Sequence, residues 1–475
     1  MYAPTSATAR MKRRLNVPSS LKDSFSGCRT KASNSQENIT TTVVWLNNTK
    51  ACTARYNIYC HLLMKDKILN IIKSIKFFNC WSLFYAVILL IAAIYNYVYN
   101  FQYYSFADVF INYQGGFVRR GLMGEMLYRL HGLGFDPLHT ALLLCLVAYL
   151  TIVMFMVNGF RHRGYSLGLL CVSFLVGGVG IFGICFFRRD FIELCILLII
   201  VKSWTKMDFR LWLVLANTLT VIAILLHEPY AFYGLPIVVL LTYLRTNKPI
   251  RSLLCWLPSS AAFLLCLKYS GNVEVYAAIM HSIKPYADYP NIIEFFTFDS
   301  MSVMRMHLHY NFFAVLNHLP TIIGSIGSIL VTLYYGANDT SQYTNSCVSP
   351  QERTNYFALL SFLMLCQIPM FTVLSTDFTR TCIYASISAY IVFFDLNAES
   401  CTKLLPQWYR NLSERALTAM NRIVPPTRLK IFAIALFIGT VQHNGQGSLG
   451  LFRDSEFGNT FMVLYKMAHL LIADS

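Results

Sequence analysis

Residues 139–157 read HTALLLCLVAYLTIVMFMV, and residues 211–226 read LWLVLANTLTVIAILL. Neither run contains Asp, Glu, Lys or Arg. A helix needs about 20 predominantly apolar residues to cross the hydrocarbon of a bilayer, and both runs approach that length. They decide the fold class, because uncharged runs of this length predict transmembrane helices. We therefore expect an all-α protein, a polytopic integral membrane helix bundle.

Similar runs recur along the chain and predict about eleven transmembrane helices. The composition agrees, since 56% of the 475 residues are hydrophobic and 13% are charged, whereas soluble domains carry about 25% charged residues. This balance excludes a soluble enzyme, a coiled coil and a secreted disulfide-rich mini-domain. The predicted spans are residues 81–99, 139–157, 166–186, 211–226, 229–244, 252–267, 319–335, 356–374, 381–394 and 431–441, with a shorter one at Phe191–Val201.

The N-terminal part of the chain differs from the rest. Residues 1–63 are rich in Ser, Thr and Asn and hold nine Lys and Arg against two acidic residues, which predicts a basic disordered arm. Residues 64–80 place isoleucines on one helical face and lysines elsewhere, which predicts a basic interfacial helix. Because the character changes abruptly at Met64, we expect Met64 to be an alternative start and residues 1–63 not to be translated; the alternative is a genuine cytosolic arm.

The remainder divides into a membrane domain and a tail. Residues 81–441 form the predicted multi-span domain, with outer-face loops at 100–138 and 268–318, and residues 442–475 form a C-terminal tail. With the 64–80 helix in the cytoplasm, nineteen Lys and Arg fall in the loops on that side and eleven on the other. The positive-inside rule therefore predicts a cytoplasmic N-terminus. The net charge of +16, beside membrane spans, favours membrane lipid as a partner over nucleic acid.

The cysteines and histidines do not form a recognisable metal motif. Fourteen cysteines are present, many of them in apolar runs, and the sequence contains no metal-type C-x-x-C pair and no H-E-x-x-H. We interpret these cysteines as small membrane hydrophobes. The sequence predicts no metal site and no cofactor.

The first outer loop carries Asp108 and the run NYQGGFVRRGLMGE, Asn112–Glu125. Gly115 and Gly116 permit a sharp backbone turn, and two adjacent arginines, Arg119 and Arg120, follow it. Guanidinium groups pair with phosphate oxygens in a bidentate fashion, so we expect a phosphate-binding loop. The alternative is that these arginines only anchor the chain to lipid headgroups. The stretch 121–133 is expected to form a short amphipathic helix.

Two more charged motifs stand at the ends of predicted spans on the same side. Arg188, Arg189 and Asp190 precede one span, and His227 and Glu228 lie between two apolar runs. Asp190 fits a helix N-cap or a partner of the helix dipole, whereas a pair of outer-face arginines is harder to explain structurally. We expect His227 and Glu228 to carry a proton or to pair with an outer-face arginine, with a purely structural pair as the alternative. Clustering of such charges on one membrane face is a site hypothesis.

The third group comprises the 268–318 loop and the pair Asp377 and Arg380. The loop mixes tyrosines with charged residues and histidines, as a sugar-binding surface requires. The same mixture occurs at membrane interfaces. We expect this loop to form the surface that binds the acceptor of a transferred sugar.

Taken together, these motifs resemble a group of bacterial polytopic proteins associated with surface polysaccharide. The layout over residues 81–395 is also similar to the type C glycosyltransferase superfamily, whose members use polyprenyl-phosphate-linked sugars. The sequence has no paired Asp-x-Asp or Glu-x-Asp in these loops, so metal dependence and the identity of the base stay open. The resemblance implies a bacterial inner (cytoplasmic) membrane protein that acts at the outer face.

The resemblance implies a membrane glycosyltransferase or polymerase in surface polysaccharide or glycan assembly. Its partners are then a polyprenyl-phosphate-linked sugar and a glycan acceptor. Asp108 is the expected general base, with Glu228 and Asp377 as further catalytic candidates. The expected substrate-binding residues are Asn112, Gly115, Gly116, Arg119, Arg120, Arg188, Arg189, Asp190, His227 and Arg380. The alternatives are a transporter or flippase of a lipid-linked glycan, or a non-catalytic membrane protein.

Overall fold

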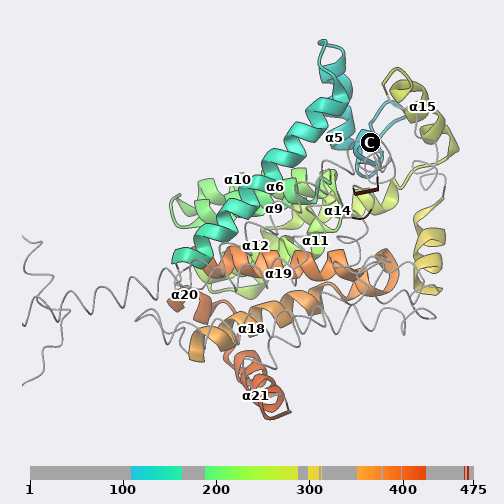
Figure 1. Cartoon of the computed structure of the whole chain (residues 1–475). Helices are drawn as coiled ribbons and strands as arrows, with labels where there is room; N and C mark the ends of the chain where they lie inside the picture. Colours follow the sequence, from blue (N-terminus) through green and yellow to red (C-terminus); the bar gives the residue numbers. More distant parts are fainter. Residues whose placement is uncertain are drawn as a thin grey trace, which may run out of the picture. The chain divides into compact units, whose positions relative to one another are not determined.

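The computed structural model describes residues 108–162, 188–286, 298–309, 350–375, 378–396 and 398–423, together with residues 312, 465, 468 and 469. All of them belong to one compact unit, residues 75–475. This part of the chain is built of helices and loops and contains no strand (Figure 1). The all-α prediction is therefore confirmed for the described residues. The expectations for 1–63, 64–80, the spans 81–99, 166–186, 319–335 and 431–441, and most of 442–475 lie outside them.

Two helices are long and apolar enough to cross a membrane. They are α6 (Pro137–His162), through its part Pro137–Met156, and α10 (Phe209–Leu226). Only 22% and 33% of their most apolar stretches are buried, whereas a core helix of a soluble protein is mostly buried. Both helices coincide with the two runs that predicted spans, and they support an association with the membrane.

The outward face of α6 is apolar. Leu143, Val147, Leu150 and Met154 recur at helical spacing, and each side chain is about half exposed or more, from 47% to 65%. An exposed apolar stripe of this kind is typical of a surface that contacts lipid or another protein.

Other predicted spans are interrupted. The 229–244 run forms α11 (Tyr230–Tyr233) and α12 (Leu235–Thr246), and the 252–267 run forms the end of α13 (Pro249–Leu254) and α14 (Leu257–Lys268). Proline stands in the first turn of α12, α13 and α14, a position it tolerates because its missing N–H has no helical partner there. At about 1.5 Å per residue, a helix of 12 residues spans roughly 18 Å, less than a bilayer core. Among the described residues, two helices therefore have the length and composition of a span, compared with about eleven predicted for the whole chain.

Helix α9 (Asp190–Trp204) lies at the centre of the described helices. It packs against α6, α10 and α19 (Phe378–Asp395), and ten of its fifteen residues are buried (Figure 1). This helix matches the short predicted span at Phe191–Val201. Its first turn consequently lies among several packed helices, which is where the charged motifs meet.

The remaining elements surround this centre. A short 3-10 turn, η1 (Asp108–Phe110), leads through a loop to α5 (Gly121–His131), and α5 packs against η1, α6 and α10. Helix α15 (Val273–Ile283) and a helical stretch at 300–309 lie within the predicted 268–318 loop, so that loop is partly helical. The C-terminal group comprises α18 (Pro350–Cys366), the π-helical turn η3 (Met370–Leu374), α20 (Ala398–Lys403) and α21 (Gln407–Ile423).

Candidate functional site

Five charged side chains from four segments meet near the first turn of α9. Asp108 stands on η1, Arg119 and Arg120 end the loop before α5, Arg189 immediately precedes α9, and Glu228 lies between α10 and α11. We call these residues the arginine–carboxylate cluster. The expected convergence of the outer-loop charges is therefore present in the structure for these five residues.

Glu228 is held by both arginines of the loop. The Nη2 and Nε groups of Arg120 donate to Glu228 Oε1 and Oε2 at 2.7 and 2.8 Å, a bidentate pairing. Arg119 Nη1 lies 3.5 Å from Glu228 Oε1. Bidentate charge-assisted pairs are among the strongest hydrogen-bonded contacts in proteins and fix the orientation of both groups.

Asp108 links the loop to α9. Arg189 Nη2 donates to Asp108 Oδ1, and Arg120 Nη1 lies 3.5 Å from Asp108 Oδ2. Arg189 Nη1 also donates to the backbone carbonyl of Arg120 at 3.1 Å. Arg189 therefore holds both the carboxylate of η1 and the backbone of the arginine loop.

The side chains of the cluster are mostly buried, and Asp108 is the most exposed of them. The side chain of Arg189 is 3% exposed, whereas that of Asp108 is 26% exposed. Burial alone would raise the pKa of Asp108, but the charges of Arg189 and Arg120 outweigh it and lower the pKa to about 2. Burial likewise acts on Glu228, and Arg120 and Arg119 hold its pKa well below the usual value. Both carboxylates are thus ionised at neutral pH, and three guanidinium groups facing two carboxylates leave one net positive charge.

The backbone conformation of the loop places Arg120 in the cluster. Its φ of 65° lies in the left-handed region, which costs a residue with a side chain about 1–2 kcal/mol. Gly116 has φ 107°, as the predicted turn requires. Gly115 allows close approach to α15, since a Cβ there would lie 2.8 Å from Val275 Cα. Arg119 N–H donates to the carbonyl of Tyr269 at 2.9 Å and fixes the end of the loop.

Other predicted binding residues have scaffolding contacts. Asn112 is fully buried; its Oδ1 accepts from Gln114 N–H at 3.1 Å and its Nδ2 donates to Ser282 Oγ at 2.8 Å. It therefore ties the loop to α15. Arg188 is half-buried beside Arg189. Asp377 lies outside the described residues, and Arg380 falls in the first turn of α19.

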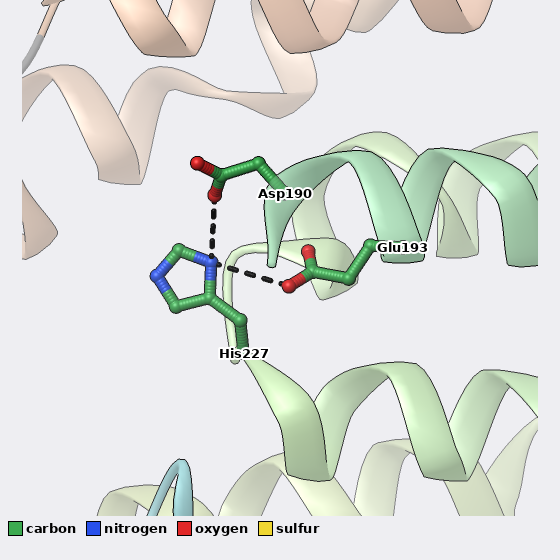
Figure 2. A group of neighbouring side chains, drawn as sticks. All are labelled: Asp190, Glu193 and His227. Carbon is green, nitrogen blue, oxygen red and sulfur yellow. Dashed lines mark ion pairs between the residues drawn. The ribbon is translucent and has the colours of Figure 1, made fainter. Parts of the chain in front are cut away.

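A second group, the buried acidic–histidine cluster, comprises Asp190, Glu193 and His227. His227 Nδ1 lies 3.4 Å from Asp190 Oδ1 and 3.4 Å from Glu193 Oε1, and all three residues are buried (Figure 2). Asp190 and Glu193 share the first turn of α9, where the helix dipole favours negative charge. Glu193 was not among the predicted site residues, although its spacing of three residues from Asp190 places the two carboxylates on one helical face.

Of the two structural interpretations of Asp190, the partner of the helix dipole agrees with its place in the first turn of α9, and the N-cap is wrong. Helix α9 begins at Asp190 itself, and the residue in the cap position is Arg189. The carboxylate of Asp190 instead accepts a hydrogen bond from the hydroxyl of Tyr384 on α19. Asp190 therefore connects two packed helices at the site.

No protein-family model, curated protein or solved structure matches this chain. The chemistry of the site is therefore inferred from its own residues.

Proposed function

We propose that this chain is a membrane glycosyltransferase or polymerase that uses a polyprenyl-phosphate-linked sugar to assemble surface polysaccharide or another glycan. The observation that carries the proposal is the arginine–carboxylate cluster, in which three guanidinium groups meet two carboxylates and Asp108 reaches solvent. A donor of this class has a phosphate that needs cationic partners and an acceptor hydroxyl that needs a base. Both kinds of group are present within one cluster.

The arginines are suited to the phosphate. Carboxylates and a backbone carbonyl orient Arg120 and Arg189. Their guanidinium groups therefore need little reorganisation to bind phosphate oxygens. A phosphate that replaces Asp108 as the partner of Arg189 would leave the guanidinium paired. During transfer, the same groups stabilise the negative charge that develops on the leaving phosphate.

Asp108 is suited to act as the base once the donor is bound. In the cluster alone its pKa of about 2 makes it ionised but weakly basic. Donor phosphate draws positive charge away from the carboxylate, and its pKa then rises toward the usual range. Asp108 takes the proton of the acceptor hydroxyl as the acceptor oxygen bonds to the anomeric carbon and the bond from that carbon to the phosphate oxygen breaks.

The membrane setting is part of the proposal. The apolar outward stripe of α6 and the length of α10 support contact with lipid, where the polyprenyl chain of the donor resides. We place the cluster at the outer face of a bacterial inner membrane, with the N-terminus in the cytoplasm, as the distribution of basic residues indicates. The part around α15, which touches the arginine loop at Gly115, is the proposed acceptor platform.

Binding of polyprenyl phosphate to the purified chain, measured by native mass spectrometry, tests the first step. We expect the wild-type chain to retain the lipid and Arg189→Gln to weaken retention by about 10-fold or more, because a hydrogen bond to a charged group contributes about 1.5–3 kcal/mol. Arg129→Gln is the matched control, since Arg129 is 74% exposed and pairs with Glu125 on α5. Equal retention by wild type and Arg189→Gln would remove the phosphate role of this arginine.

Reconstituted vesicles distinguish transfer from transport. A glycosyltransferase converts the lipid-linked sugar to product and leaves polyprenyl phosphate. A flippase moves the intact lipid-linked glycan across the bilayer with no such product. Movement without conversion would therefore favour the transporter alternative.

A further inference from the structure

The buried acidic–histidine cluster brings two carboxylates and one imidazole together among the described helices. Asp190 and Glu193 are 2% and 0% exposed, and His227 is 1% exposed. A buried carboxylate is costly unless it is paired or bound to a metal ion. A positive charge among these groups, either a proton or a cation, would lower that cost.

The contact between His227 and the two carboxylates is not a hydrogen bond. His227 Nδ1 points toward Asp190 and Glu193 in Figure 2, at 3.4 Å from each. Neither nitrogen of this imidazole makes a hydrogen bond to any residue that the structure describes, and the same holds for Glu193 Oε1. A buried imidazole aimed at two carboxylates without hydrogen-bond geometry has its ring nitrogen available as a ligand.

The distances suit a metal ion. The three candidate ligand atoms all lie within 4.8 Å of one another. Ligand atoms held about 2.0–2.2 Å from a zinc ion at tetrahedral angles lie roughly 3.4 Å apart. The two separations from His227 Nδ1 match this value, and the third, between the two carboxylates, does not exceed 4.8 Å, so the three groups surround a position that one small ion could occupy.

Two tyrosines orient the carboxylates. Tyr384 donates to Asp190 Oδ1, and Tyr233 donates to Glu193 Oε2, which leaves Glu193 Oε1 directed at His227. The rings of Tyr233 and Tyr384 stack with centroids 4.5 Å apart and an interplanar angle of 15°. Hydrogen bonds that orient the ligands are a regular part of protein metal sites.

We propose that Asp190, Glu193 and His227 bind one divalent transition-metal ion, with zinc as the best match. An imidazole with two carboxylates favours zinc or a similar ion over calcium or magnesium, which prefer oxygen ligands. The prediction of no metal site rested on local motifs, whereas these ligands come from the start of α9 and the end of α10. The proposal does not depend on the transfer reaction, because binding is measured without donor or acceptor.

The test measures zinc binding to the full chain in lipid nanodiscs after removal of metal with a chelator. Zn²⁺ is titrated in competition with a chromophoric chelator, and Co²⁺ is used as a spectroscopic probe of tetrahedral coordination. The variants are Glu193→Gln, His227→Gln and Tyr233→Phe. His139→Gln is the matched control, because His139 is exposed and pairs with Asp136 at the surface.

We expect one Zn²⁺ per wild-type chain and a tetrahedral Co²⁺ spectrum, both unchanged in His139→Gln. Tyr233→Phe, which removes an orienting hydroxyl, should weaken zinc binding by about 10-fold or more. Glu193→Gln and His227→Gln should weaken it further. X-ray absorption of the zinc-loaded wild type should show nitrogen and oxygen ligands without sulfur, a result that does not depend on how well the variants fold.

Three results would overturn the proposal. They are a wild-type chain that binds no stoichiometric zinc, undiminished binding in folded Glu193→Gln and His227→Gln, or sulfur in the coordination shell. The first of these would leave a shared proton as the charge that holds the cluster together.

Discussion

Replacement of Asp108 by asparagine removes one charge from the arginine–carboxylate cluster and keeps the shape of the side chain. Arg189 and Arg120 then lose the anion that they contact on η1. The pKa of Asp108 is lowered from 3.8 to about 2, and one pKa unit corresponds to about 1.4 kcal/mol. The carboxylate is 26% exposed, so solvent screens part of this interaction. We expect Asp108→Asn to lower the free energy of unfolding by about 1–2 kcal/mol at pH 7.

The stabilisation by the Asp108 carboxylate depends on pH in a direction that its lowered pKa determines. A carboxylate whose pKa is lower in the folded than in the unfolded state stabilises the fold above its unfolded pKa. For Asp108 this stabilisation is complete above about pH 4 and is lost as the pH falls from about 4 to about 2. The difference between wild type and Asp108→Asn should therefore be constant from pH 7 to 5 and shrink below pH 4.

The assay is unfolding in mixed detergent micelles, followed by tryptophan fluorescence at several pH values. Glu414→Gln is the control, because Glu414 is an exposed carboxylate on α21 and surface substitutions usually change stability by less than about 0.5 kcal/mol. An Asp108→Asn chain as stable as wild type at pH 7 would refute the reasoning. A difference that persists unchanged to pH 2 would assign the effect to something other than the carboxylate charge.

Two further substitutions test the cluster and its loop. Glu228→Gln should destabilise the chain by about 3–5 kcal/mol, because it removes the buried anion that Arg119 and Arg120 share; the same unfolding assay measures it, and a loss below about 1 kcal/mol contradicts it. Gly115→Ala should cost about 1–3 kcal/mol, because its Cβ would lie 2.8 Å from the backbone of Val275; thermal melting checks this, and an unchanged melting temperature would show that α15 yields easily.

The apolar runs predicted the elements that depend on local composition. Helices α6 and α10 match runs that lack charged residues, and α5 falls where the amphipathic stretch 121–133 was expected. The interruptions at α11–α12 and α13–α14 were not predicted, although Pro236 and Pro258 mark them. A long hydrophobic run has the same average hydropathy whether or not a proline restarts the helix within it.

The site was predictable where it depended on charge and unpredictable where it depended on packing. The arginine pairs and Glu228 stood out because charged residues are rare in this chain. Glu193 and Tyr384 were missed because each lies within an apolar helix, and only the packing of α9 against α10 and α19 brings them to the site. Asp190 was misinterpreted as a cap because a helix start explains an aspartate without any tertiary partner.

Transfer of labelled sugar from the polyprenyl-phosphate lipid fraction by the reconstituted chain tests the central claim most directly. We expect wild type to move the label from the lipid to a glycan product, and Arg129→Gln to do the same. Asp108→Asn should reduce the rate by about 10²-fold or more, because positioned proton transfer typically contributes that much. Folded wild-type chain that transfers no label, or transfer at the full rate by Asp108→Asn, would contradict the account.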